Sequence, residues 1–235
     1  MSLLAIETSS AVASIALCRG SALVAARAFP SRMSLCQNLT REIEALLGHL
    51  EGEALNAVAV SLGPGSFTSL RIGVMTAKAL AHRLALPLVG VPTLEVIATP
   101  FAFEASRLIA VLQPGWKGIV YLATYQGGAS GTLQGLSGPA ALELPAAIER
   151  LQATDGELLL AGEAVIEHRD ALAGALGGRI IFAPPPLCVP QAQFVAEAAR
   201  ARLAAAAPPP VHAIRPLYVV ASQAERQAGI DLGMT

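Results

Sequence analysis

Residues 61–73, which read SLGPGSFTSLRIG, combine residue types that can bind a phosphate group. Gly63 and Gly65 flank a proline after an apolar run, and hydroxyl side chains follow where a helix is expected to begin. The free amides and the dipole of a helix N-terminus attract anions. The P-loop pattern, Gly-x4-Gly-Lys-Ser/Thr, is not met, because Thr68 stands where the second glycine belongs and no lysine follows. The sequence therefore favours a tight corner that needs glycine for its backbone angles, with an anion site as the alternative.

A second polar segment lies near the N-terminus, in AIETSSAVASIAL. It resembles the first phosphate-binding segment of actin-like ATPases, in which a carboxylate helps to hold magnesium and hydroxyl groups meet phosphate. Such a site also needs an acid at a strand end in the other lobe, and the corresponding segment VLQPGWKGIVYLATY has none. We therefore expect only a vestigial nucleotide site, with no catalytic residue. Its residues would be Glu7, Thr8, Ser9, Ser10, Gly63, Gly65 and Ser66.

The side chains that usually bind metals or act as nucleophiles are scattered. The three cysteines form no CxxC pair, and the four histidines form no HxxxH or HExxH pair. No Gly-x-Ser-x-Gly elbow for serine hydrolysis is present. We expect reduced thiols, no metal site and no cofactor.

Composition narrows the class of protein. The chain has 235 residues, of which 54% are hydrophobic and 14% charged, which predicts a well-buried globular protein. Its net charge of -1 offers no basic surface of the kind that holds nucleic acid, so we expect no RNA binding by this chain alone. No apolar run is long enough to span a bilayer and no signal peptide is evident, so we expect a cytoplasmic protein without membrane contact.

The pattern of apolar residues predicts an α/β fold in two parts. The first part begins with strands, continues with alternating helices and strands, and indicates a mixed sheet with helices on its faces. Its expected strands are 3–6, 12–17, 22–29, 57–62 and 89–91, and its expected helices are 34–50, 67–84 and 93–98.

The second part repeats this order without readable sequence identity. Its expected strands are 108–112, 119–125, one near 132, 158–160 and 180–182, and its expected helices are 145–151, 164–172 and 191–206. We therefore expect an N-terminal lobe over 1–104, a smaller C-terminal lobe over 105–210 and a tail over 211–235, partly extended around 217–220.

Helices 34–50 and 67–84 carry more apolar surface than one sheet is expected to cover. The first is rich in leucine on one face, and the second has a stripe of small residues four apart. Core packing and contact with a second protein are both open interpretations of these faces. The candidate interface residues are Leu35, Leu39, Ile43, Leu46, Leu70, Gly73, Val74, Ala77 and Ala81.

Two segments resemble the TsaB (YeaZ) family, LLAIETSSAVASIAL and SLGPGSFTSLRIGVMTAKALAHRLALPLVGVPTLEVIA. The pattern Gly-Pro-Gly-Ser-Phe-Thr-x-x-Arg-x-Gly is specific to that family and to its catalytic relative TsaD. The likeness covers residues 3–98, and Pro216-Leu217-Tyr218 is similar to the family's Pro-x-Tyr near the C-terminus.

This resemblance implies an actin-like (ASKHA) fold of two RNase H-like lobes. It also implies a non-catalytic subunit that binds and activates TsaD for threonylcarbamoyl transfer to the adenosine next to the anticodon of tRNAs. TsaD-type enzymes carry an HxxxH metal motif on the helix that corresponds to 34–50, and this helix has no histidine pair.

The resemblance also implies the partners. TsaD would pair with the first two helices as a heterodimer, and a homodimer through the same surface is expected when TsaD is missing. TsaE, an ATPase, would join a larger assembly, and tRNA would be reached only through the complex.

The sequence departs from the family's pattern at several positions. The acidic and basic places at the start of the second lobe hold Pro114, Trp116 and Ile119, and Glu7 replaces the more common aspartate. The histidine often found before the first helix is Leu35, and the arginine that usually follows Pro-x-Tyr-Leu is Val220. These differences bear on nucleotide binding in the cleft and on contacts with TsaE, and they leave the dimer surface intact.

The alternative function is an ATP- or metal-dependent enzyme of the same superfamily. A kinase or a glycoprotease-like (M22) hydrolase would need catalytic carboxylates or metal ligands in the cleft, and the sequence offers mainly Glu7.

Overall fold

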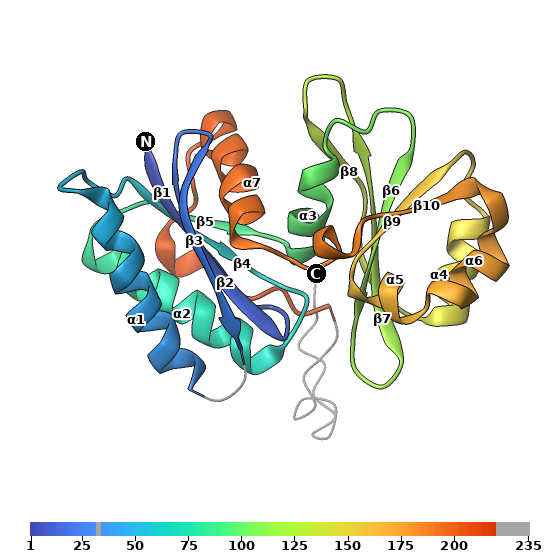
Figure 1. Cartoon of the computed structure of the whole chain (residues 1–235), viewed down its shortest axis with the longest axis horizontal. Coiled ribbons are helices and arrows are strands. Elements are labelled where there is room, and N and C mark those ends of the chain that lie inside the picture. The colour runs from blue at the N-terminus through green and yellow to red at the C-terminus, as the bar shows by residue number, and fades with distance from the viewer. Residues whose placement is uncertain (32–33, 220–235) are drawn as a thin grey trace. The chain divides into compact units, whose positions relative to one another are not determined.

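The computed structural model describes residues 1–31 and 34–219, which form two compact units (Figure 1). The first unit contains Met1–Pro100 together with Val189–Pro216, and the second contains Phe101–Cys188. Each unit is built on a five-stranded mixed sheet.

The first sheet has the strand order β3-β2-β1-β4-β5. Strands β1, β2 and β3 are antiparallel neighbours, whereas β4 and β5 run parallel to β1. Their bounds are β1 Ser2–Glu7, β2 Val12–Arg19, β3 Ala22–Pro30, β4 Ala57–Ser61 and β5 Leu88–Val91. The five strands expected in this part of the sequence are thus confirmed.

Helices cover both faces of this sheet, because the central strands are apolar on both sides. Along β1, Leu4 and Ile6 lie in one core cluster with α1 Leu35–Leu47 and α2 Phe67–Arg83. Leu3 and Ala5 lie in the other cluster, against α7 Ala192–Ala205. Alternation with period two puts successive residues on opposite faces, so a continuous apolar run fits a strand buried on both sides.

The helices of the first unit begin and end close to the expected positions. The expected helix 34–50 is α1 followed by a short 3₁₀ turn, Gly48–Leu50, and the expected helix 67–84 is α2. The helix α3, Thr93–Ala98, has the expected bounds.

The expected assignment of 191–206 to the second lobe is wrong. Helix α7 packs on β1, β2, β4 and β5, and its Ala-rich face closes the cluster that contains Leu3 and Ala5. Small side chains allow this close approach to the sheet. The bidentate pair between Arg202 of α7 and Glu95 of α3, at 2.6 and 3.2 Å, joins two helices of the same unit.

The beginning of the expected tail also belongs to the first unit. Ile214 is buried in the cluster under α1 and α2, and Lys78 Nζ donates hydrogen bonds to the carbonyl oxygens of His212 (3.2 Å) and Ile214 (3.0 Å). Residues 217–219 are not part of a strand, and Val220 lies outside the described residues. The expected boundary near residue 104 falls at Pro100–Phe101.

The second sheet has the order β10-β9-β6-β7-β8, which repeats the arrangement of the first. Its helices pack on one face, in a cluster built on Leu112, Leu122 and Leu160. The expected helix 164–172 is two helices, because the backbone leaves the helical region at His168. The bounds are β6 Leu108–Pro114, β7 Ile119–Gly127, β8 Leu133–Glu143, α4 Leu144–Gln152, β9 Leu158–Ala161, α5 Glu163–Glu167, α6 Arg169–Leu176 and β10 Ile180–Phe182.

Candidate functional site

The two polar segments singled out in the sequence meet at one edge of the first sheet. Strands β1 and β4 are parallel neighbours, so their carboxyl ends lie together, and the turn after β4 leads into α2. The amide of Ser66 donates a hydrogen bond of 2.7 Å to the carbonyl oxygen of Ser9. We call this group of residues, 7–10 with 63–66 and Gly73, the signature cluster.

Two glycines of the signature cluster are required by close packing. A Cβ atom on Gly65 would lie 2.3 Å from the carbonyl oxygen of Ser9. A Cβ atom on Gly73 would lie 2.1 Å from Oγ1 of Thr8. No side chain fits at either place without a shift of the loop after β1. The two glycines therefore allow the loop after β1 to pack directly against the start of α2.

A third glycine of the cluster, Gly63, allows the backbone conformation of the turn between β4 and α2. Gly63 has a φ of 103°, a region that favours glycine. Its amide donates to Oγ1 of Thr93 (3.1 Å), and its carbonyl accepts from the amide of Thr93 (2.8 Å). The turn is thereby fixed to the first residue of α3.

Three amides of these two segments have partners within the chain. Ser66 N–H binds Ser9, Gly63 N–H binds Thr93, and the amide of Ser9 donates to Oε1 of Glu7. The hydroxyl oxygens of Thr8 and Ser9 are buried without a hydrogen-bond partner among the described residues. The geometry is that of a closed corner, as the sequence favoured.

Glu7 is fully buried at 0% exposure, beside the first turn of α7. It continues the side of β1 that carries Leu3 and Ala5, and its antiparallel partner is Ser14. Oγ of Ser14 accepts a hydrogen bond of 3.0 Å from the amide of Ala192, the first residue of α7. The positive end of a helix dipole stabilises a carboxylate placed near it.

The second sheet also carries an acid at a strand end, which the sequence analysis missed. Gln113 is the last residue but one of β6, where an acid was sought, and Glu163 comes two residues after the neighbouring strand β9. Glu163 N–H donates to Oε1 of Gln113 (3.1 Å), and Nε2 of Gln113 donates to Oε2 of Glu163. Burial raises the pKa of the Glu163 carboxyl.

A local signal for this acid was present in the sequence. Gly162 separates β9 from α5 with a φ of 108°, and a Cβ atom on it would lie 2.1 Å from the carbonyl oxygen of Leu112. A buried strand followed by Gly-Glu, in LLLAGEAV, therefore places the acid at the end of β9, next to β6.

The nine candidate interface residues on the first two helices are not on a surface. Leu35, Leu39, Ile43 and Leu46 of α1 are buried, as are the five residues assigned on α2. Six of them lie in the cluster that attaches α1 and α2 to the sheet: Leu39, Ile43, Leu46, Val74, Ala77 and Ala81. Leu70 and Gly73 are buried on the same helix. The stripe of small residues therefore serves packing within the chain, and this part of the site assignment is wrong.

The exposed side of α2 lies away from its buried stripe. Met75 is 62% exposed, and Phe67 and Leu84 are also exposed large apolar residues of this segment. The guanidinium of Arg71 lies 3.8 Å from the centroid of the Phe67 ring, which is a cation–π contact. We call Phe67, Arg71 and Met75 the outer face of α2.

The positions at which the sequence departs from the family's pattern have different surroundings. Pro114 ends β6, Ile119 begins β7, and Trp116 is an exposed residue of the loop between them. Nζ of Lys117 lies 4.4 Å from the centroid of the Trp116 ring. Leu35 is buried at the start of α1.

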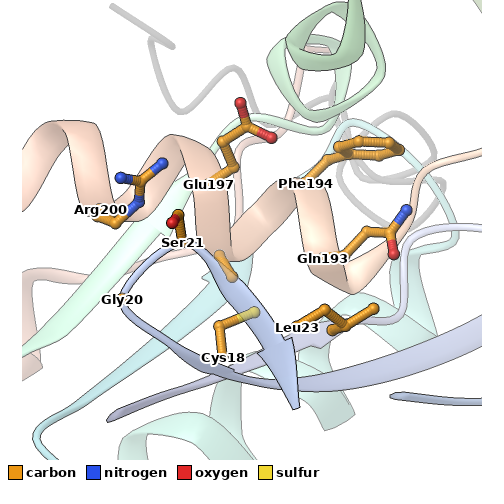
Figure 2. Close-up of a pocket in the computed structure, with 9 residues that line it drawn as sticks. Cys18, Gly20, Ser21, Leu23, Gln193, Phe194, Glu197 and Arg200 are labelled. Atoms are coloured by element: carbon orange, nitrogen blue, oxygen red, sulfur yellow. The ribbon is translucent and has the colours of Figure 1, made fainter. Parts of the chain in front are cut away.

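A hollow of about 270 Å³ lies between the β2–β3 hairpin and α7 (Figure 2). Cys18, Leu23 and Phe194 line it, with Glu197 and Arg200 on the helix. Burial raises the pKa of the Cys18 thiol, so the thiol stays protonated and is a weak nucleophile. The hollow therefore lacks a reactive group.

A metal-binding group and a membrane-spanning helix are both absent from residues 1–31 and 34–219. No three His, Cys, Asp or Glu side chains come together there as a metal-binding group. None of the helices in this part of the chain combines the length and apolar character needed to cross a membrane.

Solved structures with a similar fold establish the class of the protein. A crystal structure from Pseudomonas aeruginosa, described as similar to the peptidase YEAZ, superposes with a TM-score of 0.76 at 22% identity, over 93% of this chain and 99% of that one. A ROK hexokinase from Thermus thermophilus superposes with a TM-score of 0.51 at 11% identity, over 87% of this chain and 100% of that one. The protein therefore has the actin-like (ASKHA) fold of two RNase H-like lobes, as expected.

Sequence comparisons give the family. A family model described as "TsaD: tRNA N6-adenosine threonylcarbamoyltransferase" matches residues 32–167, more than half of the chain. The tRNA threonylcarbamoyladenosine biosynthesis protein TsaB of Bacillus subtilis is 27% identical over 227 residues, 96% of each chain. The TsaB protein of Escherichia coli is 37% identical over 110 residues, 46% of this chain and 47% of that protein. The chain belongs to the family that this TsaD-type model describes, and the two curated relatives named above are TsaB proteins.

Proposed function

We propose that this chain takes part in the biosynthesis of threonylcarbamoyladenosine on tRNA, as a non-catalytic subunit that binds and activates a TsaD-type transferase. Family membership supports the pathway, since both TsaB relatives are described as proteins of that biosynthesis. The proposal places the chain in the cytoplasm and gives it no cofactor of its own.

The closed signature cluster is the observation that carries the non-catalytic role. Its glycines fit against Ser9 and Thr8, and the amides of Ser9, Gly63 and Ser66 bind groups within the chain. A segment of this kind fixes the start of α2. The most specific stretch of the sequence therefore positions a helix.

The outer face of α2 is the surface proposed for the transferase. Large exposed apolar residues, such as Met75, are typical of the centre of a protein interface. Arg71 stacked on Phe67 adds a rigid pair of residue types that are enriched in interface hot spots. Arg41 and Glu44 of α1 are exposed polar residues that could lie at the rim.

The remaining partners follow from the same proposal. TsaE would join the assembly, tRNA would be bound by the complex, and the outer face of α2 would support a homodimer when the transferase is absent.

Size-exclusion chromatography with the cognate TsaD-type transferase tests the proposal. The two purified proteins mixed at micromolar concentration should elute as a heterodimer. Separate elution of the two proteins would contradict the proposal.

Calorimetry separates this function from the enzymatic alternative. Because Glu7 is fully buried and accepts a hydrogen bond from Ser9, the chain alone should not bind ATP with magnesium. Tight binding that Glu7→Ala abolishes would support a kinase or hydrolase instead.

A further inference from the structure

Strand β3 is an exposed edge of the first sheet. It pairs with β2 on one side, and it is the outermost strand in the order β3-β2-β1-β4-β5. Leu23 and Val24 are exposed, and Arg27 is the one charged residue in ALVAARAFP. An edge strand of this length and apolar character is a template for pairing with another strand.

The register of β3 shows which of its backbone groups face away from the sheet. Ser31 N–H donates 2.9 Å to the carbonyl oxygen of Ala11, so residue 31 points its backbone groups toward β2. The pairing is regular from Val12↔Pro30 to Leu17↔Ala25. The direction of hydrogen bonding alternates along an antiparallel strand, so the groups of Ala26, Ala28 and Pro30 point outward.

The outward N–H and C=O groups of β3 lack one donor, and the groups that remain are complementary to the same groups on a second copy of the strand. Pro30 has no N–H, so the edge offers the amides of Ala26 and Ala28 as donors. The carbonyl of Ala26 already accepts a hydrogen bond of 3.1 Å from Nη1 of Arg27. The acceptors that remain are the carbonyls of Ala28 and Pro30. Two donors and two acceptors in this order are complementary to a second copy running antiparallel.

We propose that β3 is a strand-addition site for a second copy of this chain, with the twofold axis at Ala28. In this register Ala28 pairs with Ala28 of the second copy, and Ala26 pairs with Pro30 of the second copy. Four hydrogen bonds form, two between the Ala28 residues and two from Ala26 amides to Pro30 carbonyls. The carbonyl of Ala26 keeps the guanidinium that it already binds.

The other antiparallel registers fit less well. A twofold axis at residue 27 would place the two Arg27 side chains directly opposite each other, and like charges in that position are destabilising. An axis at Ala26 would pair Ala28 with Val24, where the β2–β3 register is irregular. With the axis at Ala28, Arg27 instead faces Phe29 of the second copy, and a guanidinium is attracted to an aromatic ring.

The proposed contact is small, so we expect weak association. A few hydrogen bonds and alanine side chains bury less surface than the about 1,200 Å² of a stable interface. The contact lies on a strand edge and not on the outer face of α2, so it does not depend on the proposed function.

Cysteine crosslinking tests the register. In a Cys36→Ser background, which removes the exposed thiol, Ala28→Cys places the two introduced thiols directly opposite each other. The Cα atoms of such a pair are about 5.5 Å apart, within the range of a disulfide. Ala26→Cys is the matched control, because the two introduced residues would lie about 14 Å apart at about 3.4 Å per residue.

We expect mild oxidation to give at least about tenfold more covalent dimer for Ala28→Cys than for Ala26→Cys, because only the first pair is within reach. Adding Met75→Glu, which alters the outer face of α2, should leave this ratio unchanged. Equal crosslinking of the two variants, or none, would overturn the proposal.

Sedimentation velocity provides the second measurement. Ala28→Pro removes an outward N–H without removing a hydrogen bond to β2. In a Met75→Glu background we expect a concentration-dependent dimer, and adding Ala28→Pro should abolish it. Thermal melts confirm that the strand still folds. Retention of the dimer in a folded Ala28→Pro variant would overturn the proposal.

Discussion

At the scale of single residues, the signature cluster depends on two positions where a side chain has no room. Gly65 lies against the backbone oxygen of Ser9, which cannot rotate away, whereas Gly73 lies against the side chain of Thr8. Gly174, in the interior of α6, has open space around it. The same substitution should therefore have opposite effects at Gly65 and Gly174.

Gly65→Ala should lower the free energy of unfolding by about 1–3 kcal/mol, the usual cost of overpacking. Gly174→Ala should raise it by about 0.5–1 kcal/mol, because alanine is the better helix former. Urea unfolding of the two variants beside the unsubstituted chain measures both changes. A neutral Gly65→Ala would show that the loop after β1 is free to move.

The buried carboxyl of Glu163 predicts a pH dependence of stability. Its pKa is raised by desolvation, so in the folded state it holds its proton at a pH where the unfolded chain has lost it. The stability it contributes is fully present below the unfolded pKa of about 4.3 and is lost as the pH rises through the higher folded pKa.

Glu163→Gln removes this titration and can keep the contacts with Gln113. The stability of the variant relative to the unsubstituted chain should therefore increase from pH 4 toward neutrality, by less than about 1.4 kcal/mol per unit of pKa shift because solvent screens this partly exposed carboxyl. Urea midpoints measured across this range check the sign. A relative stability that falls with rising pH would contradict the assignment of a raised pKa.

At the scale of elements, the spacing of apolar residues predicted where the first two helices lie. It did not predict which side of each helix is exposed, because the residues assigned to an interface are buried. Leu39, Ile43 and Leu46 recur with helical spacing, and they do form α1. The most apolar stripe of such a helix is the one that faces its own sheet. Met75 lies on the opposite side of α2 and is exposed. It is not part of a repeating apolar pattern, so the sequence did not single it out.

This difference predicts how substitutions on α2 act. Met75→Glu should abolish the heterodimer with the TsaD-type transferase and leave the melting temperature nearly unchanged, because the side chain is exposed. Ala77→Glu should unfold the first unit, since it would bury an unpaired charge in the core. Ile166→Glu, on exposed α5, is the matched control and should do neither. Chromatography and melting curves separate the three outcomes.

The sheet against which α7 packs is a second feature that could not be predicted from local sequence. Its Ala-rich pattern predicted a helix, and the strand order of the second lobe suggested that it closed that lobe. The structure places it on the first sheet, where Ala196 and Ala199 meet β1 and its neighbours. A contact between segments about 190 residues apart cannot be read from a single sequence, which shows only that the side chains have compatible sizes.

At the scale of the whole molecule, the first unit is assembled from two separate parts of the chain. Residues 1–100 supply the sheet, α1, α2 and α3, and residues 189–216 supply α7 and the buried Ile214. Without α7, one face of the sheet would expose Leu3, Ala5 and their neighbours to water.

A fragment of residues 1–100 should therefore not fold alone, and coexpression with a fragment of residues 189–216 should restore it. Circular dichroism and the dispersion of amide signals in NMR spectra measure the recovery. A folded 1–100 fragment would show that α7 is dispensable for the first unit.

For the whole molecule, we propose a role as the activating subunit of a TsaD-type transferase. The most direct measurement is threonylcarbamoylation of tRNA in a reconstituted system, with the threonylcarbamoyl-adenylate donor supplied and this chain present or absent. We predict modification that requires the chain, is lost with Met75→Glu and is retained with Ile166→Glu. Equal modification without the chain would contradict the account.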